Sequence, residues 1–294
     1  MNKPSRRILF VHAHPDDESL GNAATMAKYI AEGVEVSLVT CTLGEGGPII
    51  PPELEHLGSR RDDTLGRHRA EELAAAMRQI GVTDHRFLGG AGRYRDSGKM
   101  GSSQNERPNC FWQADVDVAA GYLAEVIREI RPHVVVTYDE NGGYGHPDHI
   151  QAHRVTMRAI TLASNAGFGK SEPHQVAKVY RNCLPRSLVE SSLRQLQESS
   201  GAARHGRIAT VEYIPGVIDD DLVTSAIDGR QYAMQKAAAM RAHATQIVVD
   251  WPYFTLSDGV VQPVYATEYY QLLQSAVGDR VTGGIWEDDL FTGL

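Results

Sequence analysis

The chain has 294 residues, of which 42% are hydrophobic and 22% are charged, a composition typical of a globular protein with one large domain or a domain plus a smaller one. Its 29 basic and 37 acidic residues give a net charge of −8, and no Lys/Arg run predicts a nucleic-acid or membrane surface. No stretch approaches the roughly 18 apolar residues of a membrane-spanning helix. The first apolar run is also too short for a secretory leader. Cys41, Cys110 and Cys183 form no CxxC pair, so we expect a cytoplasmic protein without a disulfide framework.

Strands and amphipathic helices alternate through the first half. Residues 8–11 form a short apolar run of the kind found in buried parallel strands. Apolar residues then recur at helical spacing from Leu20 to Ala31, and Gly33 is expected to end that helix. A second strand is predicted over residues 34–40. Further helices are predicted within residues 73–80, 116–130 and 147–163, and further strands at 87–88 and 133–138.

This alternation predicts an α/β fold, with a parallel sheet covered by helices on both faces. Beyond residue 165 the pattern weakens, and strands at 176–180 and 208–214 with a helix at 231–242 suggest a smaller α+β portion. We therefore expect a catalytic core over residues 1–165 and a carboxyl-terminal portion, 166–294, that helps to close the substrate pocket. The long loops at 41–60 and 89–112 are expected to shape that pocket.

One tetrapeptide pattern occurs twice, as His14-Pro15-Asp16-Asp17 and as His146-Pro147-Asp148-His149. Each copy comes after a predicted strand and opens a predicted helix. Because ligands of open parallel sheets bind beyond the carboxyl ends of the strands, we expect the two copies to lie together.

Three residues of the two copies form a plausible ligand set for a divalent metal. His14 and Asp17 are three positions apart, so both side chains can reach a common point, and His149 completes a set of two imidazoles and one carboxylate. Such a set leaves coordination positions open, as catalytic sites do. The start of a helix also disfavours protonated imidazole, and neutral imidazole is the form that binds metal.

The remaining polar residues of the pattern suggest catalytic roles. Asp16 is expected to act as general base on a metal-activated water, and His146 to donate a proton to a leaving amine or to stabilise the tetrahedral intermediate. Tyr144 is expected to donate a hydrogen bond to the oxyanion. Asp148 is expected to orient one of the histidines from behind. His12 alternates with His14 along the strand, so it is expected to point into the core.

At these residues the chain resembles the LmbE-like (PIG-L) zinc deacetylases, whose mark is Ala-His-Pro-Asp-Asp-Glu after the first strand and a later His-Pro-Asp-His. Here these motifs stand at residues 13–18 and 146–149. The resemblance is strongest to the branch that deacetylates N-acetylglucosaminyl-inositol in mycothiol biosynthesis, and similar stretches stand at residues 10–20, 40–45, 88–93, 95–98, 141–149, 242–246 and 286–294.

The resemblance implies a Rossmann-like core in which zinc is held by His14, Asp17 and His149, with the catalytic roles given above. It also implies that Arg69 and Asp96 contact hydroxyls of an amino-sugar inositol substrate, a task for which both side chains are suited. The reaction would release acetate and a free amine. Departures from the branch lie in pocket loops, where Gly47-Pro48 replaces a Glu-containing stretch and Lys99 is inserted, so the substrate preference stays open.

Several alternatives remain at this point. A sister branch hydrolyses mycothiol S-conjugates with the same zinc chemistry, although its members tend to carry Lys where Gly21 stands and Tyr-Pro-His where Tyr144-Gly-His runs. A non-haem Fe(II) oxygenase would present a similar facial triad, and a sugar-binding module would use the metal without catalysis. Zinc and ferrous iron both accept these ligands, and the sequence predicts no oligomeric state.

Overall fold

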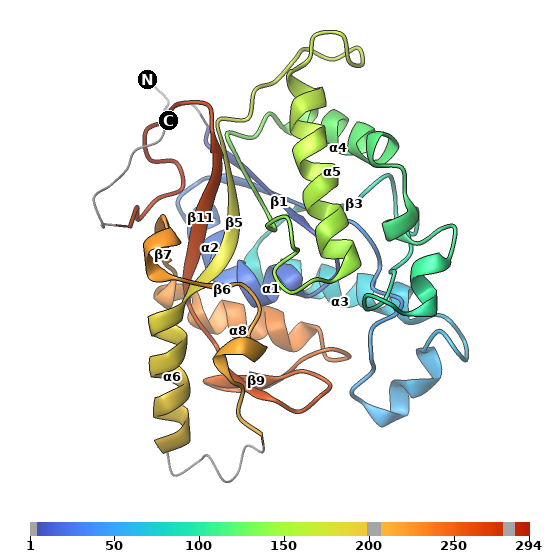
Figure 1. Cartoon of the computed structure of the whole chain (residues 1–294), viewed down its shortest axis with the longest axis vertical. Coiled ribbons are helices and arrows are strands. Elements are labelled where there is room, and N and C mark those ends of the chain that lie inside the picture. Colours follow the sequence, from blue (N-terminus) through green and yellow to red (C-terminus); the bar gives the residue numbers. More distant parts are fainter. Residues whose placement is uncertain (1–4, 199–206, 279–285) are drawn as a thin grey trace.

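The computed structural model describes residues 5–198, 207–278 and 286–294. Within these residues the main sheet has eight strands, seven of them in the order β3-β2-β1-β4-β5-β11-β7, with β6 paired to β5 (Figure 1). Neighbouring strands from β3 to β5 are parallel, whereas β11 runs antiparallel to both of its neighbours. The bounds are β1 (Arg7–His12), β2 (Glu35–Thr40), β3 (Asp84–Phe87), β4 (Val134–Thr137), β5 (Lys178–Pro185), β6 (Val217–Ile218), β7 (Ser225–Asp228) and β11 (Thr267–Ser275).

Strand β1 is buried on both faces, which explains its uninterrupted apolar sequence. Ile8 and Phe10 pack in a cluster with α2 (Ala23–Ala31), α3 (Leu65–Ile80) and α8 (Ala233–Ala242). Leu9 and Val11 face the opposite cluster, which holds α4 (Val116–Ile130) and α5 (Pro147–Ser164). In Figure 1, α4 and α5 lie together, away from α8. The predicted α/β fold with helices on both faces is confirmed.

The helix predicted from Leu20 to Ala31 is in fact two helices, α1 (Asp17–Gly21) and α2, separated at Asn22. The Asn22 side chain is fully buried. It donates to His12 Nε2 at 2.9 Å and accepts from the Tyr270 hydroxyl at 3.0 Å. These two contacts come from different strands of the sheet, so apolar periodicity alone could not predict the break.

The carboxyl-terminal region departs most from the prediction. The strand predicted at 208–214 is wrong, because Val211–Tyr213 forms a 3-10 turn and Ile208 makes only an isolated bridge. Strand β11, which the sequence did not indicate, lies inside the main sheet between β5 and β7. The other elements of this region are α6 (Arg186–Glu198) and a three-stranded sheet of β8 (Val248–Asp250), β9 (Tyr253–Thr255) and β10 (Val261–Pro263).

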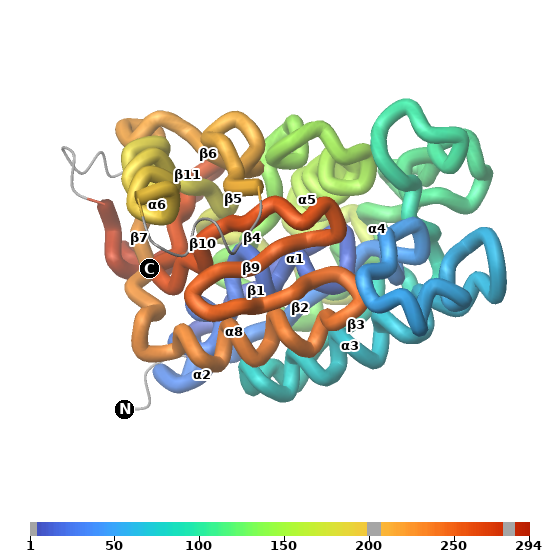
Figure 2. Tube along the Cα trace, turned by 90° about the horizontal axis from the view of Figure 1, so that it is seen from below, coloured from blue at the N-terminus to red at the C-terminus, as the bar shows by residue number. Residues whose placement is uncertain are grey.

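The small sheet crosses in front of α1 and β1 when the molecule is seen from below (Figure 2). The division of the chain at residue 165 stays a prediction, and the main sheet continues across that position from β4 into β5. Among the described residues, no helix combines the length and apolar character needed to cross a bilayer.

Candidate metal centre and active site

The site lies where the order of the strands reverses. From β1 the chain moves outward to β2 and β3, and then returns to the other side of β1 as β4. Residues 14–17 follow β1 and residues 146–149 open α5 after β4, so the two His-Pro-Asp segments meet at the switch point of the sheet. They line one cavity of about 580 Å³.

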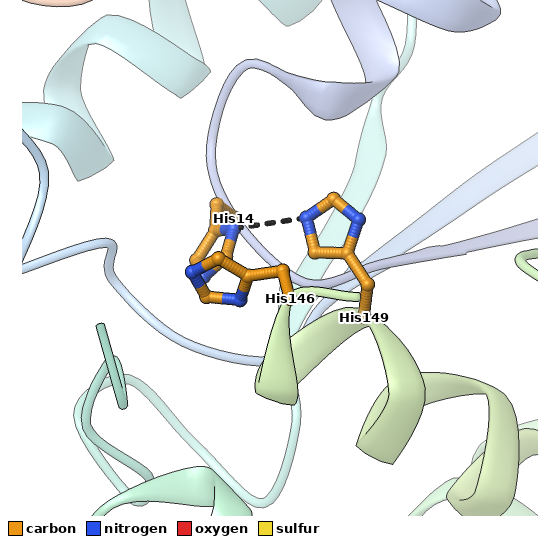
Figure 3. A group of neighbouring side chains, drawn as sticks. All are labelled: His14, His146 and His149. Carbon is orange, nitrogen blue, oxygen red and sulfur yellow. Dashed lines mark hydrogen bonds between the residues drawn. The ribbon is translucent and has the colours of Figure 1, made fainter. Parts of the chain in front are cut away.

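The three expected metal ligands converge in this cavity. His14 Nδ1 lies 3.3 Å from His149 Nε2 and 3.6 Å from Asp17 Oδ2, and His149 Nε2 lies 3.5 Å from Asp17 Oδ1 (Figure 3 shows the two rings facing each other). Ligand atoms about 2.0–2.1 Å from a tetrahedral zinc ion are roughly 3.3–3.4 Å apart. The donor types and their spacing therefore fit a divalent ion. His146 lies beside them, with a ring nitrogen within 4.8 Å of those of His14 and His149.

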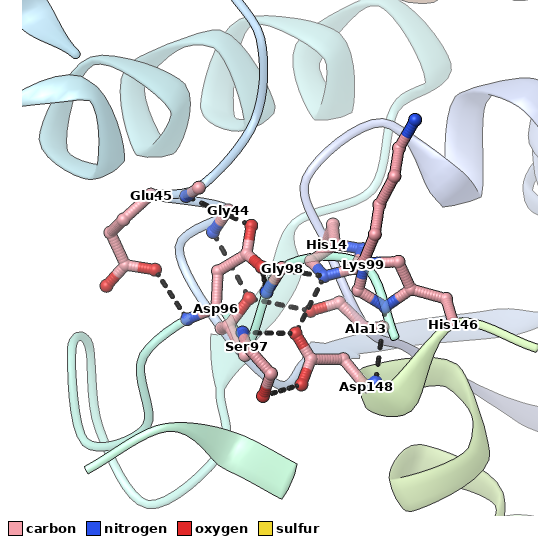
Figure 4. Close-up of polar contacts among 12 residues, drawn as sticks. Ala13, His14, Gly44, Glu45, Asp96, Ser97, Gly98, Lys99, His146 and Asp148 are labelled. Atoms are coloured by element: carbon pink, nitrogen blue, oxygen red, sulfur yellow. Dashed lines mark hydrogen bonds and ion pairs between the residues drawn. The ribbon is translucent and has the colours of Figure 1, made fainter. Parts of the chain in front are cut away.

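The outer nitrogen of His14 is held by Asp148. His14 Nε2 lies 3.0 Å from Asp148 Oδ2, and Asp148 is completely buried. That carboxylate also accepts from the backbone N–H of Ser97 at 2.9 Å and from the Ser97 hydroxyl (Figure 4). A carboxylate behind a metal-binding imidazole fixes its orientation and leaves the other nitrogen for the ion. Asp148 thus lies where an orienting residue must be.

The local charge also suits a cation. Burial lowers the pKa of His14, but the carboxylates of Asp96, Asp148 and Asp17 more than reverse this effect and raise the pKa to about 10. The proton on His14 therefore compensates negative charge that a divalent ion could compensate instead.

His149 is held in the neutral form that a metal ligand needs. Burial lowers its pKa to about 4, an effect that Asp17 opposes and His14 reinforces. The ring stacks on Tyr138, with centroids 4.3 Å apart, and is hydrogen-bonded to the backbone of Gly142.

Asp16 has an unusual backbone and an unusual pKa. Its φ of 128° lies in the region that favours glycine, and the residue directly precedes α1. Burial raises the pKa of its carboxyl to about 6, although Arg69 opposes the rise. A carboxyl that titrates near neutrality is suited to act as general base.

Arg69 holds Asp16 in this conformation. Its Nη2 lies 3.0 Å from Asp16 Oδ2 and also donates to the carbonyl of Pro15, while Nη1 donates to the carbonyl of Gly44 at 2.7 Å. Arg69 lines the cavity but is only 2% exposed. Its expected contact with a substrate stays a prediction, and its visible role is to fix Asp16.

Asp96 also lines the cavity and is also largely engaged by the protein. Its Oδ2 accepts from Gly46 N–H at 3.1 Å and its Oδ1 from Gly98 N–H at 2.7 Å. Oδ1 lies 3.8 Å from His14 Nε2. The substrate contact expected of Asp96 stays a prediction.

The loop before α5 carries the two remaining catalytic candidates. His146 Nδ1 accepts from the Asp148 N–H at 3.2 Å, which caps α5 and leaves Nε2 for the cavity. Burial lowers the His146 pKa to about 3, with repulsion from His14 and His149 contributing. Tyr144 is 52% exposed, and its ring stands edge-on to His149 with centroids 5.0 Å apart. Both side chains can therefore reach a substrate in the cavity.

Two buried residues that the sequence did not single out support Asp16. Glu18 Oε2 accepts the Asp16 backbone N–H at 3.0 Å, and Glu18 Oε1 lies 2.8 Å from His243 Nε2. Neither Glu18 nor His243 is exposed at all. Both lie in stretches that resemble the deacetylases, but 225 positions separate them, and no local pattern links residues so far apart.

The carboxyl-terminal half supplies the far wall of the cavity. This wall is largely apolar and aromatic, and comes from β5, β11, α8, the loop at 213–216 and the small sheet with its adjoining loops. Its members include Tyr213, Met240, Phe254, Leu256, Tyr265 and Tyr269. The candidate metal centre therefore opens toward a face that can pack against the rings of a sugar-like ligand.

Comparisons with solved structures agree with the fold. The 4-carboxy-2-hydroxymuconate hydratase GalB of Pseudomonas putida gives a TM-score of 0.59 at 18% identity, covering 94% of this chain and 99% of that one. The N,N'-diacetylchitobiose deacetylase of Pyrococcus horikoshii gives 0.55 at 18% identity, covering 82% and 71%. A hydratase and a deacetylase thus share the fold, and at this identity the likeness shows the fold alone.

Comparisons of sequence are more specific. A 1D-myo-inositol 2-acetamido-2-deoxy-alpha-D-glucopyranoside deacetylase of Streptomyces griseus is 59% identical over 291 residues, covering 99% of this chain and 90% of that protein. A protein of the same name from Geodermatophilus obscurus is 53% identical, covering 99% of both chains. The family model described as GlcNAc-PI de-N-acetylase matches residues 9–160. The chain belongs to this family, PIG-L.

Proposed function

We propose that the chain is a metal-dependent hydrolase that removes the acetyl group from N-acetylglucosaminyl-inositol, giving glucosaminyl-inositol and acetate. The convergence of His14, Asp17 and His149 beside Asp16 is the observation that carries this proposal. The names and the identity of the relatives, 53% to 59% over nearly the whole chain, support the choice of substrate.

The residues around the cavity suit amide hydrolysis. An ion held by His14, Asp17 and His149 would polarise the amide carbonyl and acidify a water molecule. Asp16 accepts a proton from that water as it attacks the carbonyl carbon. The Tyr144 hydroxyl donates a hydrogen bond to the negative charge that develops on the carbonyl oxygen. The Nε2–H of neutral His146 faces the cavity and can donate a hydrogen bond that stabilises the tetrahedral intermediate, while the proton taken up by Asp16 passes to the amine as the C–N bond breaks.

The test is to measure release of free amine from N-acetylglucosaminyl-inositol and from a bimane conjugate of mycothiol, side by side. Preferential turnover of the first compound is expected. Clear preference for the conjugate would make the chain an amidase of the sister branch, and turnover of neither would reject the hydrolase proposal. The oxygenase alternative has little support, because such sites usually lie on β-barrels and this site lies on a parallel α/β sheet.

We further propose that the working ion is zinc, with ferrous iron as the alternative. Protein purified without oxygen should contain about one divalent ion per chain. Removal by a chelator should abolish turnover, and readdition of Zn²⁺ or Fe²⁺ will tell which ion restores it more fully. A chelated protein that retained full activity would exclude a metal from the mechanism.

A further inference from the structure

Tyr138, the residue directly after β4, is a buried side chain outside the two His-Pro-Asp segments that contacts both of them. Its hydroxyl donates to Asp17 Oδ2 at 2.8 Å, and its ring stacks on the His149 imidazole with centroids 4.3 Å apart and planes at 29°. The side chain therefore touches one proposed ligand from each segment. Tyr138 is only 7% exposed.

The contacts of Asp17 divide its two carboxylate oxygens between different tasks. Oδ2 accepts from the Tyr138 hydroxyl and from the His14 backbone N–H at 2.9 Å. Oδ1 lies 3.5 Å from His149 Nε2, on the side where the ligands converge. Oδ2 also lies 3.6 Å from His14 Nδ1, but it already accepts two hydrogen bonds, so Oδ1 is the oxygen left free to bind an ion.

A chain of buried hydrogen bonds sets the direction of the Tyr138 proton. Asn22 donates from its amide nitrogen to His12 Nε2 at 2.9 Å, because its amide oxygen already accepts from Tyr270. His12 Nδ1 must then carry the ring proton, and it donates to the Tyr138 oxygen at 3.2 Å. The Ala13 N–H donates to the same oxygen at 2.9 Å.

With two donors directed at its oxygen, Tyr138 has one hydrogen-bonding option left, which is to donate its own proton to Asp17. The chain that enforces this runs from Tyr270 through Asn22 and His12, and all three are nearly inaccessible to solvent. Water therefore does not compete for these positions, and the arrangement is fixed in advance of metal binding.

We propose that Tyr138 is a positioning residue that makes Asp17 a one-oxygen ligand and fixes the plane of His149. His12 and Asn22 determine that the Tyr138 hydroxyl donates its proton to Asp17. This inference rests on the proposed metal-dependent function. It assigns a task to residues outside the proposed ligand set, and it predicts that metal affinity depends on the Tyr138 hydroxyl.

The decisive experiment compares Tyr138→Phe with wild type in equilibrium binding of Zn²⁺ against a chelator of known affinity. The phenyl ring keeps the stacking on His149 and loses only the donor to Asp17. We expect metal affinity to fall by about 10- to 100-fold. The visible spectrum of the Co²⁺-substituted protein should also change, because a freed Asp17 can bind through both oxygens.

Tyr29→Phe is the matched control. Tyr29 is fully buried, and like Tyr138 its hydroxyl donates to a carboxylate, Asp289 Oδ1 at 3.0 Å, and accepts from a backbone N–H, that of Leu290 at 2.8 Å. It packs, however, in the cluster on the α2, α3 and α8 side of the sheet. This variant should lose stability and keep wild-type metal affinity and the wild-type Co²⁺ spectrum.

A second pair of variants, at His12, tests the same hydrogen-bond chain independently, in case Tyr138→Phe does not fold. His12→Leu removes the donor to Tyr138 and should weaken metal binding by about 3- to 10-fold, whereas His12→Gln can still accept from Asn22 and donate to Tyr138 and should retain most of the affinity. Wild-type affinity and spectrum in both Tyr138→Phe and His12→Leu would overturn the inference and leave the proposed function standing. A wild-type protein that binds no divalent ion would overturn both.

Discussion

The two segments that build the site share the sequence His-Pro-Asp, yet the turns around them are held in different ways. After β1, Asp16 has a φ of 128° and is clamped by Arg69 through its side chain and by Glu18 through its backbone N–H. After β4, the loop at 142–145 depends on three glycines with positive φ, and Tyr144 between them is 52% exposed.

This difference matches the tasks proposed for the two turns. A general base and a metal ligand must be in place before the substrate arrives, so buried partners from several elements fix them. A hydroxyl that meets a developing oxyanion can be carried on a loop that adapts to the substrate. Substitutions in the first turn are therefore expected to have large effects. The effect of a substitution in the second turn is expected to depend on what the substituted residue contacts.

The largest effect is expected in the first turn, at Asp16. Asp16→Asn preserves size and removes the proton acceptor, so kcat should fall by about 10²- to 10⁴-fold, the range for losing a general base. Metal content should stay at the wild-type level, because the ligands are untouched. Turnover of N-acetylglucosaminyl-inositol and metal analysis on the same preparation check both points. A variant as active as wild type would show that another group accepts the proton, and that the clamp serves stability alone.

The contact between Glu18 and the Asp16 backbone can be tested through His243, the buried partner of Glu18. His243→Leu leaves Glu18 buried without its imidazole partner, and losing one member of a buried pair typically costs about 3–5 kcal/mol of unfolding free energy. Urea unfolding of the metal-free protein measures the loss. His56→Leu, at an exposed histidine, should change stability by no more than about 0.5 kcal/mol. If the two variants unfolded alike, the first turn would not depend on its distant partners.

The same contrast explains what the sequence could and could not predict. Periodicity indicated β1, β2, β4, α4 and α5, because each buries one or two regular faces. The repeated tetrapeptide then indicated that its two copies would meet, since parallel strands end at one edge of the sheet. Strand β11 and the break at Asn22 were missed, because both depend on partners brought in from remote parts of the chain.

The site follows the same rule. His14, Asp17 and His149 could be picked out because local spacing and strand order bring them together. The more distant supports of the site could not be picked out, because His243 reaches Glu18, beside Asp16, from the carboxyl-terminal half, and Tyr138 acts on Asp17 through the direction of a hydrogen bond rather than through any pattern. Candidate ligands and Asp148, which holds His14, stand inside the repeated motif and are visible in the sequence, whereas supporting residues outside the motif are visible only in three dimensions.

In the second turn, Tyr144→Phe removes only the hydroxyl of Tyr144 and so tests its contribution alone. We expect turnover to slow by roughly 10- to 1000-fold, the range for losing one oxyanion donor, with little change in metal affinity or stability. Tyr122→Phe is a suitable control, because Tyr122 is also exposed and lies outside the cavity lining. An unchanged kcat for Tyr144→Phe would remove this tyrosine from the mechanism and leave the loop with a purely structural role.

The smallest and sharpest effect separates two neighbouring glycines of the same loop. Gly142 and Gly143 have φ values of 63° and 77°, so alanine at either position should cost about 1–2 kcal/mol from its backbone conformation alone. Their surroundings differ. A Cβ on Gly142 would stand 2.6 Å from His149 Cβ and 2.7 Å from the Ile150 nitrogen, whereas a Cβ on Gly143 would meet nothing within 4 Å. Gly142→Ala should therefore displace His149 and weaken Zn²⁺ binding by about 10-fold, while Gly143→Ala should lose stability and keep its affinity for Zn²⁺.

Chelator competition measures the Zn²⁺ affinity of both variants, and thermal unfolding measures their stability. Equal affinities would mean that the second turn places His149 without help from the close approach of Gly142, and that helix α5 and the Tyr138 ring are sufficient.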